Sequence, residues 1–362
     1  MSVERGLLCY CRAGFEPELA AELGERAAQA GIAGYPKTQR GSAFVQYVCD
    51  DAQLLTQRLP FRSLIFARQK LVQLIELPGL GAAAGARPDR VGALLRGLES
   101  ALGAPHMRFG DVRVEHPDSD AGGPLAGLAR ALGNALRPAL REAGWLTPQD
   151  SAARARLHVL LVSGDHAIVA MADPSDSTAD PLGIPRLRMN PQAPSRSALK
   201  LEEAFLTLLD ASERNAWFGD NLYAADLGAA PGGWSWVLMR QGVRVISVDN
   251  GPLAQHLLDS GRVEHLRADG FVWHPKRMLD WMVCDMVEQP RRVAARMATW
   301  MREGWCRRTV FNLKLPMKKR WDETRHCLAL FESEAGIPLD VRARQLYHDR
   351  EEITVFAQRS SR

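Results

Sequence analysis

Three short motifs in the second half of the chain each follow an apolar run with the composition of a buried β-strand. They are Asp226-Leu-Gly-Ala-Ala-Pro-Gly-Gly233, Cys284-Asp285 and Asn312-Leu-Lys314. Strands that are apolar throughout are typical of parallel sheets covered by helices on both faces. The carboxyl ends of such strands meet at one edge of the sheet, where ligands bind. The motifs therefore predict an α/β domain with a Rossmann-like sheet and a site at that edge.

The region around these motifs alternates strand-like and helix-like segments. The first five strands are apolar and separated by helical segments, which predicts parallel neighbours, and the last is expected to run antiparallel at or near an edge. Residues 196–362 form this predicted Rossmann-like domain. The six strands are expected at residues 222–227, 244–249, 263–267, 281–285, 309–313 and 353–358.

The first half of the chain has a different pattern, in which strands and helices suggest an α+β arrangement with antiparallel partners. We expect a ferredoxin-like unit at residues 1–80, a second unit at residues 81–175 and a proline-rich linker at residues 176–195. A Gly- and Ala-rich stretch at residues 78–86 predicts a loop between the two units. Strands are expected at residues 7–11, 43–48, 63–74, 111–115, 157–162 and 166–171, and helices at 16–30, 53–58, 89–102 and 125–143.

Composition bounds the class of protein. With 362 residues, 46% of them hydrophobic and 24% charged, the chain resembles a soluble protein of two or three domains. No apolar stretch approaches the ~18 residues that a membrane-spanning helix needs. The six cysteines form no Cys-x-x-Cys pair and lie mostly in apolar runs, which predicts a reduced, cytoplasmic compartment. No His, Cys and Asp cluster has the spacing of metal ligands, so no metal is expected.

The positive charge is concentrated in one segment. The net charge is only +4, but residues 291–320 contain ten Arg or Lys and a single acid, Glu303. Such a segment attracts polyanions, and its alternative interpretation is a solvated helix face. Because the segment includes Lys314, we expect it to hold the phosphates of a polyanion beside the site.

The glycine-rich motif predicts the kind of cofactor. Gly228, Gly232 and Gly233 allow a sharp turn and a close approach of the backbone to a ligand. Their spacing matches neither the dinucleotide fingerprint nor a P-loop. Pro231 also lacks the N–H that a phosphate cradle would use. The motif predicts a nucleoside-like cofactor without phosphates, and the alternative is a plain strand-to-helix turn.

Two acids stand at the ends of the following strands. Asp249 lies about twenty residues after the glycine motif, where an acid can accept both hydroxyls of a ribose. Asp269 follows the third strand, and its expected partner is the adenine edge. Either acid alone could instead cap a helix.

Four further polar residues are expected at the same edge. Asp285 ends an apolar strand, where burial is costly unless the carboxylate is paired, and Lys314 offers that pairing. Lys200 lies in the first turn of a helix that Ser197 begins, where the helix dipole disfavours a cation. Glu352 opens the final strand. The alternative for Lys314 is a lysine that guards a sheet edge, and Lys200 and Glu352, taken singly, are equally well explained as surface charges.

Together these residues resemble a known family. Lys200, Asp285, Lys314 and Glu352, with the glycine motif, are similar to the K-D-K-E set of RrmJ/FtsJ-type 2′-O-ribose methyltransferases. Longer strings resemble the ribosomal large subunit methyltransferase M (RlmM) family, and they cover residues 248–252, 281–288, 311–320 and 345–352. In the N-terminal half the resemblance is one of element order.

The resemblance implies a THUMP-containing, RNA-binding N-terminal region joined to a catalytic domain. It implies S-adenosylmethionine-dependent methylation of the 2′-hydroxyl of the cytidine at position 2498 of 23S rRNA, with Lys314 as proton acceptor. No obligate protein partner is expected, and the chain is expected to be a monomer. The implied cofactor contacts are Ser197, Ala230, Pro231, Gly232, Gly233, Asp249, Asp269 and Asp285.

Three other functions stay open at this point. A nicotinamide-dependent dehydrogenase uses a similar sheet, but the glycine spacing and Pro231 disfavour it. An RNA-binding protein with an inactive methyltransferase-like domain would not need all four polar residues. A base methyltransferase would carry an Asn/Asp-Pro-Pro-aromatic loop where this chain has Asp285-Met-Val-Glu.

Overall fold

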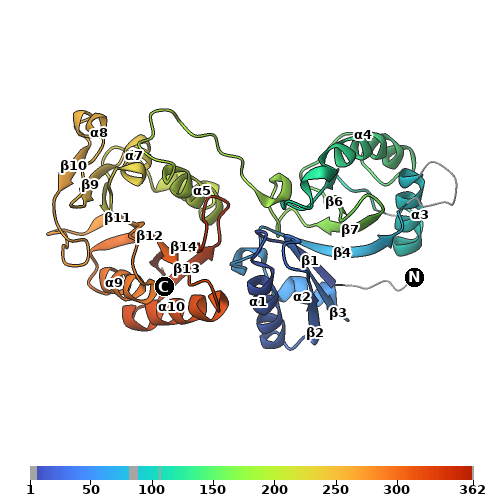
Figure 1. Cartoon of the computed structure of the whole chain (residues 1–362), viewed down its shortest axis with the longest axis horizontal. Coiled ribbons are helices and arrows are strands. Elements are labelled where there is room, and N and C mark those ends of the chain that lie inside the picture. Colours follow the sequence, from blue (N-terminus) through green and yellow to red (C-terminus); the bar gives the residue numbers. More distant parts are fainter. Residues whose placement is uncertain (1–5, 81–88, 106, 361–362) are drawn as a thin grey trace. The chain divides into compact units, whose positions relative to one another are not determined.

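The computed structural model describes residues 6–80, 89–105 and 107–360. The chain divides into two compact units, Met1–Ile184 and Pro185–Arg362, and each is built on one seven-stranded sheet (Figure 1). The predicted loop at residues 78–86 lies mostly outside the described residues. No described helix is both long enough and apolar enough to cross a bilayer.

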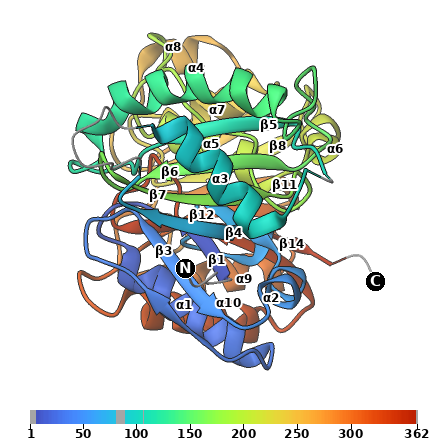
Figure 2. The same cartoon turned by 90° about the vertical axis from the view of Figure 1, so that its right-hand side faces the viewer.

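The sheet of the first unit has the strand order β2-β3-β1-β4-β7-β6-β5. Neighbours are antiparallel except β5 and β6, which are parallel. The long strand β4 pairs with β1 on one side and with β7 on the other, so the segments 1–80 and 81–175 share one continuous sheet. Helices α3 and α4 pack on its β4 and β5 strands (Figure 2). The elements are β1 (Gly6–Tyr10), α1 (Glu16–Gln29), β2 (Gly34–Lys37), β3 (Phe44–Cys49), α2 (Ala52–Arg58), β4 (Gln69–Pro78), α3 (Arg90–Leu102), β5 (Asp111–Glu115), α4 (Ala126–Glu142), β6 (Arg156–Leu161) and β7 (His166–Ala172).

One predicted strand of this unit is wrong in its first half. The strand expected at residues 63–74 begins only at Gln69, and Phe61–Ser63 forms a short 3-10 helix instead. The intervening apolar residues are buried, but a side chain satisfies their backbone. Glu22 of α1 accepts hydrogen bonds from the N–H groups of Ile65 (2.7 Å) and Phe66 (2.9 Å). A buried backbone needs partners for its polar groups, and here they come from a carboxylate rather than from a sheet ladder.

The sheet of the second unit has the order β10-β9-β8-β11-β12-β14-β13. The five strands from β10 to β12 are parallel, and β14 is antiparallel to both β12 and β13, which confirms the predicted sheet. The elements are α5 (Ala198–Leu208), α6 (Ala211–Ala216), β8 (Tyr223–Leu227), α7 (Gly233–Arg240), β9 (Arg244–Val248), α8 (Gln255–Asp259), β10 (Val263–Leu266), β11 (Leu279–Cys284), α9 (Pro290–Arg302), β12 (Cys306–Lys314), α10 (Arg320–Ala335), β13 (Leu339–Arg344) and β14 (Glu352–Arg359).

Helices cover both faces of this sheet. Figure 1 shows α5 and α7 on one face and α9 and α10 on the other. The core on the α5 side is rich in aromatic side chains, with Phe205, Trp236 and Trp281 all buried. The strand order reverses between β8 and β11, and in open α/β sheets a crevice for ligands forms at such a point. The glycine motif follows β8 and Asp285 follows β11, so both stand at this crevice.

Two strands of the structure, β2 and β13, were not expected from the sequence. Both are edge strands, paired on one side only. β2 is mostly exposed and contains Pro36, which an edge strand tolerates. β13 carries Asp340 and Arg342 and no apolar run. Edge strands lack the continuous apolar pattern of buried strands, so the hydrophobic signal was missing in both cases.

The segment between the units begins as part of the first unit. Asp176 accepts a hydrogen bond from the N–H of Phe61 (2.6 Å), and the N–H of Leu182 donates to Glu115 (2.7 Å). Residues 176–184 of the predicted linker are therefore held against the first sheet, and the boundary between the two compact units falls after Ile184.

Candidate active site

The glycine motif forms a tight turn between β8 and α7. Gly228 and Gly232 have φ angles of 76° and 110°, which L side chains rarely adopt. A Cβ atom on Gly233 would lie 2.4 Å from the Oγ of Ser195 and 2.6 Å from that of Ser197. The indole N–H of Trp234 donates to the carbonyl of Ser197 (2.9 Å). The turn therefore requires glycine, and it brings Ser197 and Gly233 together at the start of α5.

Asp249 braces this turn. Its carboxylate accepts hydrogen bonds from the N–H groups of Ala230 (2.9 Å) and Gly251 (2.7 Å). Asp269 is exposed in the loop after β10 and accepts from the N–H of Phe271 (2.8 Å). Both acids stand at the carboxyl edge of the sheet, where the sequence placed them. Their predicted contacts with the ribose and the adenine stay predictions.

A further acid, Asp226, lies beneath the glycine motif. The sequence predicted no role for it beyond its place at the end of a strand. Asp226 is buried and accepts a hydrogen bond from the Oγ of Ser235 (2.6 Å), which lies 2.6 Å from the Oγ of Ser247. Burial raises the pKa of Asp226 to about 7, although the Ser235 hydrogen bond opposes that rise. This network ties β8 and β9 to the first turn of α7 and so holds the glycine turn in place.

The four predicted polar residues come together in an alternating ring of charge. The Nζ of Lys314 lies 2.5 Å from the Oδ1 of Asp285 and also pairs with Glu352. The Nζ of Lys200 lies 3.3 Å from the Oδ2 of Asp285 and pairs with the other oxygen of Glu352. Each lysine bridges both carboxylates, so the formal charge of the ring is zero. Residues separated by up to 152 positions thus meet at one point of the sheet edge.

Strand register explains why they meet. Lys314 is the direct partner of Glu352 across the antiparallel pair of β12 and β14. Cys284 is the partner of Phe311 across the parallel pair of β11 and β12, so Asp285 emerges beside the end of β12. Lys200 reaches the same place from the first turn of α5. The sheet therefore sets three members of the ring, and the packing of α5 sets the fourth.

The ring determines the protonation of Lys314. Burial lowers the pKa of this amine, but Asp285 and Glu352 raise it through their charges and hydrogen bonds, and the net direction is upward. In the structure Lys314 is thus an ammonium held by two carboxylates. To accept a proton it must first lose one, which a further positive charge nearby would favour.

Three residues behind Asp285 form a chain of hydrogen bonds. The Nδ2 of Asn312 donates to the Oδ1 of Asp285 (2.9 Å), and the hydroxyl of Thr354 lies 2.7 Å from the Oδ1 of Asn312 and 3.0 Å from the Oδ2 of Asp349. All three side chains are buried, and burial raises the pKa of Asp349 well above its ordinary value. The chain orients Asp285. Its sequence signal was Asn312 itself, a polar residue within an apolar strand.

Glu203 anchors the loop that precedes Glu352. Its carboxylate accepts from the N–H groups of Tyr347 (2.7 Å) and His348 (2.9 Å), and the His348 ring nitrogen lies 2.7 Å from it. Glu203 stands three residues after Lys200 on α5, so one helix carries a member of the ring and the anchor of the next loop. Sequence reasoning did not single out Glu203, because a glutamate in a helix carries no distinguishing pattern.

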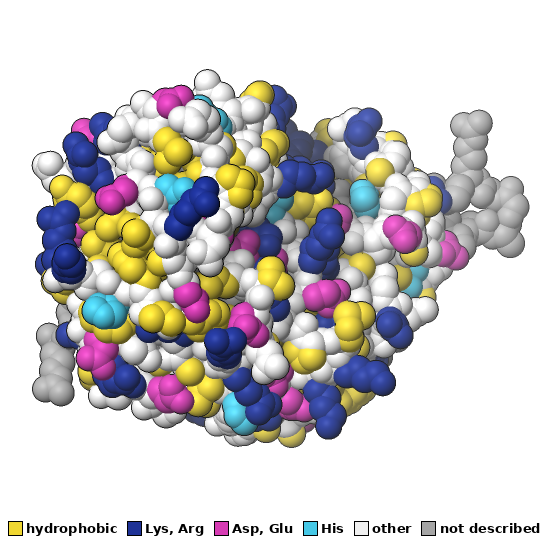
Figure 3. Space-filling view, turned by 60° about the vertical axis from the view of Figure 1, so that its left-hand side comes forward, with side chains coloured by type: hydrophobic (Ala, Val, Ile, Leu, Met, Phe, Trp, Pro, Cys, Tyr) yellow, Lys and Arg dark blue, Asp and Glu magenta, His cyan; other side chains and the backbone are white. Residues whose placement is uncertain are grey.

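Most of the basic segment at residues 291–320 is neutralised within the protein. On the face shown in Figure 3, Lys and Arg side chains are interspersed with acidic and hydrophobic ones rather than gathered into one patch. Lys318 and Lys319 are exposed, and no ion pair to a described residue involves either of them. Ion pairs within the segment or to its neighbours join Arg291 to Glu323, Arg292 to Glu288, Arg302 to Glu303, Arg307 to Asp280 and Arg320 to Glu351.

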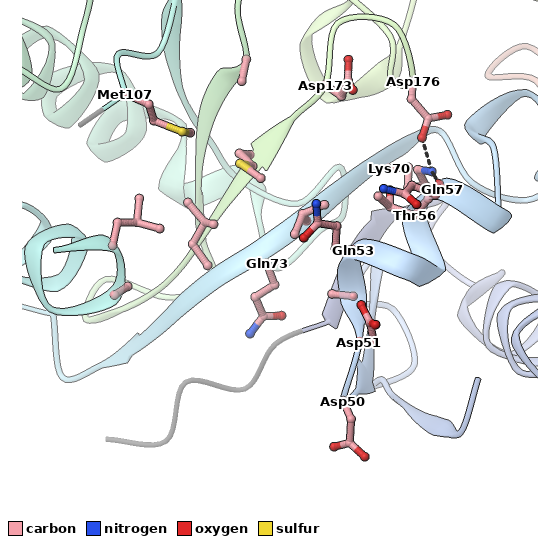
Figure 4. Close-up of a pocket in the computed structure, with 17 residues that line it drawn as sticks. Asp50, Asp51, Gln53, Thr56, Gln57, Lys70, Gln73, Met107, Asp173 and Asp176 are labelled. Carbon is pink, nitrogen blue, oxygen red and sulfur yellow. Dashed lines mark hydrogen bonds and ion pairs between the residues drawn. The ribbon is translucent and has the colours of Figure 1, made fainter. Parts of the chain in front are cut away.

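A cavity of about 710 Å³ lies elsewhere, within the first unit. It is bounded by α2, β4, the end of α3 and β7, and it contains none of the predicted site residues. Figure 4 shows Lys70 pointing towards Asp176 at one end of this cavity, beside Thr56 and Gln57 of α2. The catalytic residues expected from the sequence are thus all in the second unit, and the cavity offers a buried, ion-paired lysine to compare with the partly exposed Lys314.

The sheet order, the glycine turn and the match of residues 193–333 to the FtsJ-like methyltransferase family define the second unit as a methyltransferase domain. Residues 4–71 match the RlmM ferredoxin-like domain, and residues 89–173 match the N-terminal region of ribosomal RNA large subunit methyltransferase M.

Relatives of known name extend the match to nearly the whole chain. The ribosomal RNA large subunit methyltransferase M of Xanthomonas euvesicatoria is 65% identical over 354 residues, which cover 98% of this chain and 99% of the relative. That of Stenotrophomonas maltophilia R551-3 is 65% identical over 352 residues, 97% and 96% of the two chains. The chain therefore belongs to the ribosomal RNA large subunit methyltransferase M family, which confirms the resemblance seen in the sequence. The THUMP assignment stays a prediction.

Matches among solved structures include two proteins with low sequence identity. TrmN from Thermus thermophilus is 16% identical, with a TM-score of 0.35 and coverage of 98% of this chain and 100% of its own. The fibrillarin pre-rRNA processing protein of Methanococcus jannaschii is 10% identical, with a TM-score of 0.35 and coverage of 60% and 87%.

Proposed function

We propose that this protein transfers a methyl group from S-adenosylmethionine to a ribose 2′-hydroxyl of large-subunit ribosomal RNA. The proposed acceptor is the 23S cytidine that the family resemblance implies, and the proposed base is Lys314. The ring formed by Lys200, Asp285, Lys314 and Glu352 at the carboxyl edge of the sheet carries this proposal. Family membership supports the substrate class.

The residues around the glycine turn fit the proposed methyl donor. Gly232 and Gly233 present backbone without side chains, next to Ser197 and below the edge where Asp285 stands. Asp249 and Asp269 supply carboxylate oxygens for ribose hydroxyls and for the adenine edge. When bound, S-adenosylmethionine supplies a methyl group on a positively charged sulfur. The remaining work of the protein is to orient the acceptor oxygen and to remove its proton.

Lys314 is placed for both tasks. Asp285 and Glu352 accept two of the three hydrogen bonds that the Lys314 amine can donate. The side chain is still partly open to solvent, so a hydroxyl can approach the amine at its third position. A hydroxyl held about 3 Å from the methyl carbon and in line with the leaving sulfur gains much of its rate from orientation. Lys314 can lose its proton to the solvent, and the positive charge of the bound methyl donor beside the ring would favour that loss. The neutral amine then accepts the 2′-hydroxyl proton as the new bond forms.

The first unit is proposed to select the RNA. It matches two family regions that are distinct from the catalytic domain, and its sheet carries no part of the ring. A fragment beginning at Pro185 is expected to bind S-adenosylmethionine but not to methylate 23S rRNA. Full activity of that fragment would contradict the proposed role of the first unit.

The proposed setting is a reducing, cytoplasmic compartment. The six cysteines are all buried and free, which supports it. The chain is proposed to act as a monomer.

The decisive experiment uses a labelled methyl donor and unmodified 23S rRNA. A 2′-O-methyl group makes the adjacent phosphodiester resistant to alkali, so the label is expected at one alkali-resistant linkage. Mapping that linkage identifies the nucleotide. Label in an alkali-labile position would indicate base methylation instead, and RNA binding without any transfer would favour the inactive, RNA-binding alternative.

A further inference from the structure

Several large apolar side chains are exposed at the edge of the catalytic sheet. Val287 is 90% exposed, Met317 is 74% exposed and Tyr347 is 38% exposed. Apolar side chains scattered singly over a surface need no explanation, but these three stand in three loops next to the ring. The exposed large hydrophobics of the described residues are Tyr35, Met189, Leu206, Val272, Met278, Val287, Met317 and Tyr347.

The strand order places these three loops side by side. Val287 follows Asp285 in the loop after β11, and Met317 follows Lys314 in the loop after β12. Tyr347 lies in the loop before β14, which begins at Glu352. Since β11, β12 and β14 are consecutive neighbours, their loops border the same stretch of the edge.

These side chains are not misplaced parts of the core. Each has a neighbour in sequence that packs inward. Met286 lies over the glycine turn, where its Cγ would be 2.5 Å from a Cβ on Gly228, and Leu315 and Leu346 are buried. The N–H of Leu315 also donates to the carbonyl of Glu351 (2.7 Å). The loops are therefore fixed by their inward residues, and the outward ones face the solvent, where a partner can reach them.

Charge identifies the kind of partner. Lys318 and Lys319 directly follow Met317, and both are exposed without an ion pair to any described residue. Apolar side chains beside two exposed cations match a ligand with a flat apolar part and phosphates, which describes a nucleotide. A protein segment would need to offer acids to the two lysines and would leave the ring without a substrate.

We propose that Val287, Met317 and Tyr347 form a contact surface for the unstacked base of the target nucleotide, while Lys318 and Lys319 hold the phosphates beside it. This inference rests on the proposed function and concerns how the RNA presents its 2′-hydroxyl. The Lys314 side chain is only 24% exposed, so a ribose held within a stacked helix reaches its amine less easily than a ribose drawn out of the stack. A nucleotide drawn out of the stack brings only its ribose to Lys314, and its base packs on the exposed side chains in place of its former stacking neighbours.

The test compares apolar residues at opposite ends of one strand. Val287 follows β11, whereas Met278, which is 50% exposed, precedes it. The double variant V287S/M317S is expected to lower kcat/KM on 23S rRNA about tenfold, mainly through KM, because the two serines lose the apolar contact area that the base would bury. M278S is the matched control and is expected to behave as wild type. S-adenosylmethionine binding by each variant checks its fold.

A second readout does not depend on turnover. An RNA fragment centred on the mapped nucleotide carries 2-aminopurine next to it, and S-adenosylhomocysteine is added so that no methyl transfer occurs. Wild type and M278S are expected to raise its fluorescence on binding as the stack opens, and V287S/M317S is expected not to. Equal fluorescence and equal kcat/KM for wild type and V287S/M317S would overturn the contact surface. If wild type transfers no methyl group at all, the proposed function fails instead.

The proposed phosphate contacts of Lys318 and Lys319 are tested separately, by the salt dependence of RNA binding. K318A/K319A is expected to weaken RNA binding and to reduce the salt dependence of the affinity, by about 0.7 in log–log slope for each phosphate of single-stranded RNA that the variant no longer neutralises. R302A, which removes a cation already paired with Glu303, is the control and should leave that slope unchanged. An unchanged slope in K318A/K319A would contradict the assignment of the phosphates.

Discussion

Two lysines, the buried Lys70 in the first unit and the partly buried Lys314 in the second, form ion pairs with carboxylates, but their surroundings differ. The Nζ of Lys70 on β4 donates to the carbonyls of Thr56 (3.0 Å) and Leu59 (2.6 Å) and pairs with Asp176, and its side chain is 2% exposed. The three hydrogen bonds of that amine all go to partners within the protein, and Figure 4 shows the one to Asp176. Among the described residues, Lys314 is held by two carboxylates, and its side chain is 24% exposed.

Under the proposed function, burial and pairing alone do not distinguish the catalytic lysine from a structural one. Lys70 satisfies carbonyls at the end of α2 and fastens residues 173–176 to the sheet, so its ammonium is a structural cross-link. Lys314 shares both of its carboxylates with Lys200, and one direction of its amine remains accessible. A lysine that acts as a base needs an amine that the substrate hydroxyl can reach, and surrounding charges whose effect on its pKa a bound ligand can change. Only the second lysine has them.

The largest expected effect separates the two lysines directly. Lys314→Ala should lower methyl transfer by about a thousandfold, since general-base catalysis contributes about 10²–10⁴-fold. Binding of RNA and of S-adenosylmethionine should be preserved. Single-turnover transfer with saturating RNA measures this, and Lys70→Met is the matched control, with activity near that of wild type at low temperature. Normal turnover in Lys314→Ala would mean that another group is the base.

For stability we expect the opposite order: Lys70→Met should be the more damaging variant and Lys314→Ala the less damaging one. Lys70→Met removes one partner of a buried pair and leaves the Oδ2 of Asp176 and two carbonyls without the lysine donor, which should destabilise the first unit by about 3 kcal/mol. Lys314→Ala should change stability less, because the ring is partly open to solvent. Thermal unfolding followed by hydrogen exchange in α2 would locate the change. Unaltered protection of α2 would show that Lys70 is not a structural cross-link.

The pH dependence of transfer tests the charge balance of the ring. Burial lowers the pKa of Lys314, but Asp285 and Glu352 raise it above its ordinary value, so the neutral base becomes more abundant as pH rises. The rate should therefore increase with pH until the Lys314 pKa is passed. Glu352→Gln removes one of the two charges that raise this pKa, so the profile should move to lower pH.

Glu351→Gln is the control for that shift, because Glu351 pairs with Arg320 outside the ring. Its profile should overlay that of wild type. A rate that falls with rising pH, or a Glu352→Gln profile that coincides with the control, would argue against Lys314 as the titrating base.

The smallest expected effect concerns the hydrogen-bond chain behind Asp285. Thr354→Val removes the hydroxyl that contacts Asn312 and Asp349, and the loss of a buried hydrogen bond of about 1 kcal/mol corresponds to roughly fivefold. The loss should appear in kcat with KM unchanged, because the chain orients Asp285 and does not touch RNA. Thr354→Ser should restore the rate. Failure of the serine variant to rescue would indicate a packing effect instead.

Much of the catalytic unit could be predicted because its signals are local. A glycine that must adopt a positive φ, a proline in a turn and an acid at the end of an apolar strand are all visible in a few residues, and Gly232, Asp249 and Asp285 were found in this way. The edge strands β2 and β13 were not predicted, because a strand that is paired on one side only lacks the apolar pattern of a buried strand. The hydrogen bonds that join Asn312, Thr354 and Asp349 were also not predicted, because these residues lie up to 42 positions apart in the sequence.

By itself, the sequence determined most of the order of strands and helices, the glycine turn and the family, because each depends on residue types at short spacing. The tertiary structure alone decided that Lys200 meets Asp285 across 85 positions and that Lys314 lies opposite Glu352. It also decided that the Lys70 amine is buried with all its hydrogen bonds made, whereas Lys314 stays partly exposed. Those outcomes depend on strand register and helix packing, where hydrogen bonds join groups that are distant in the chain.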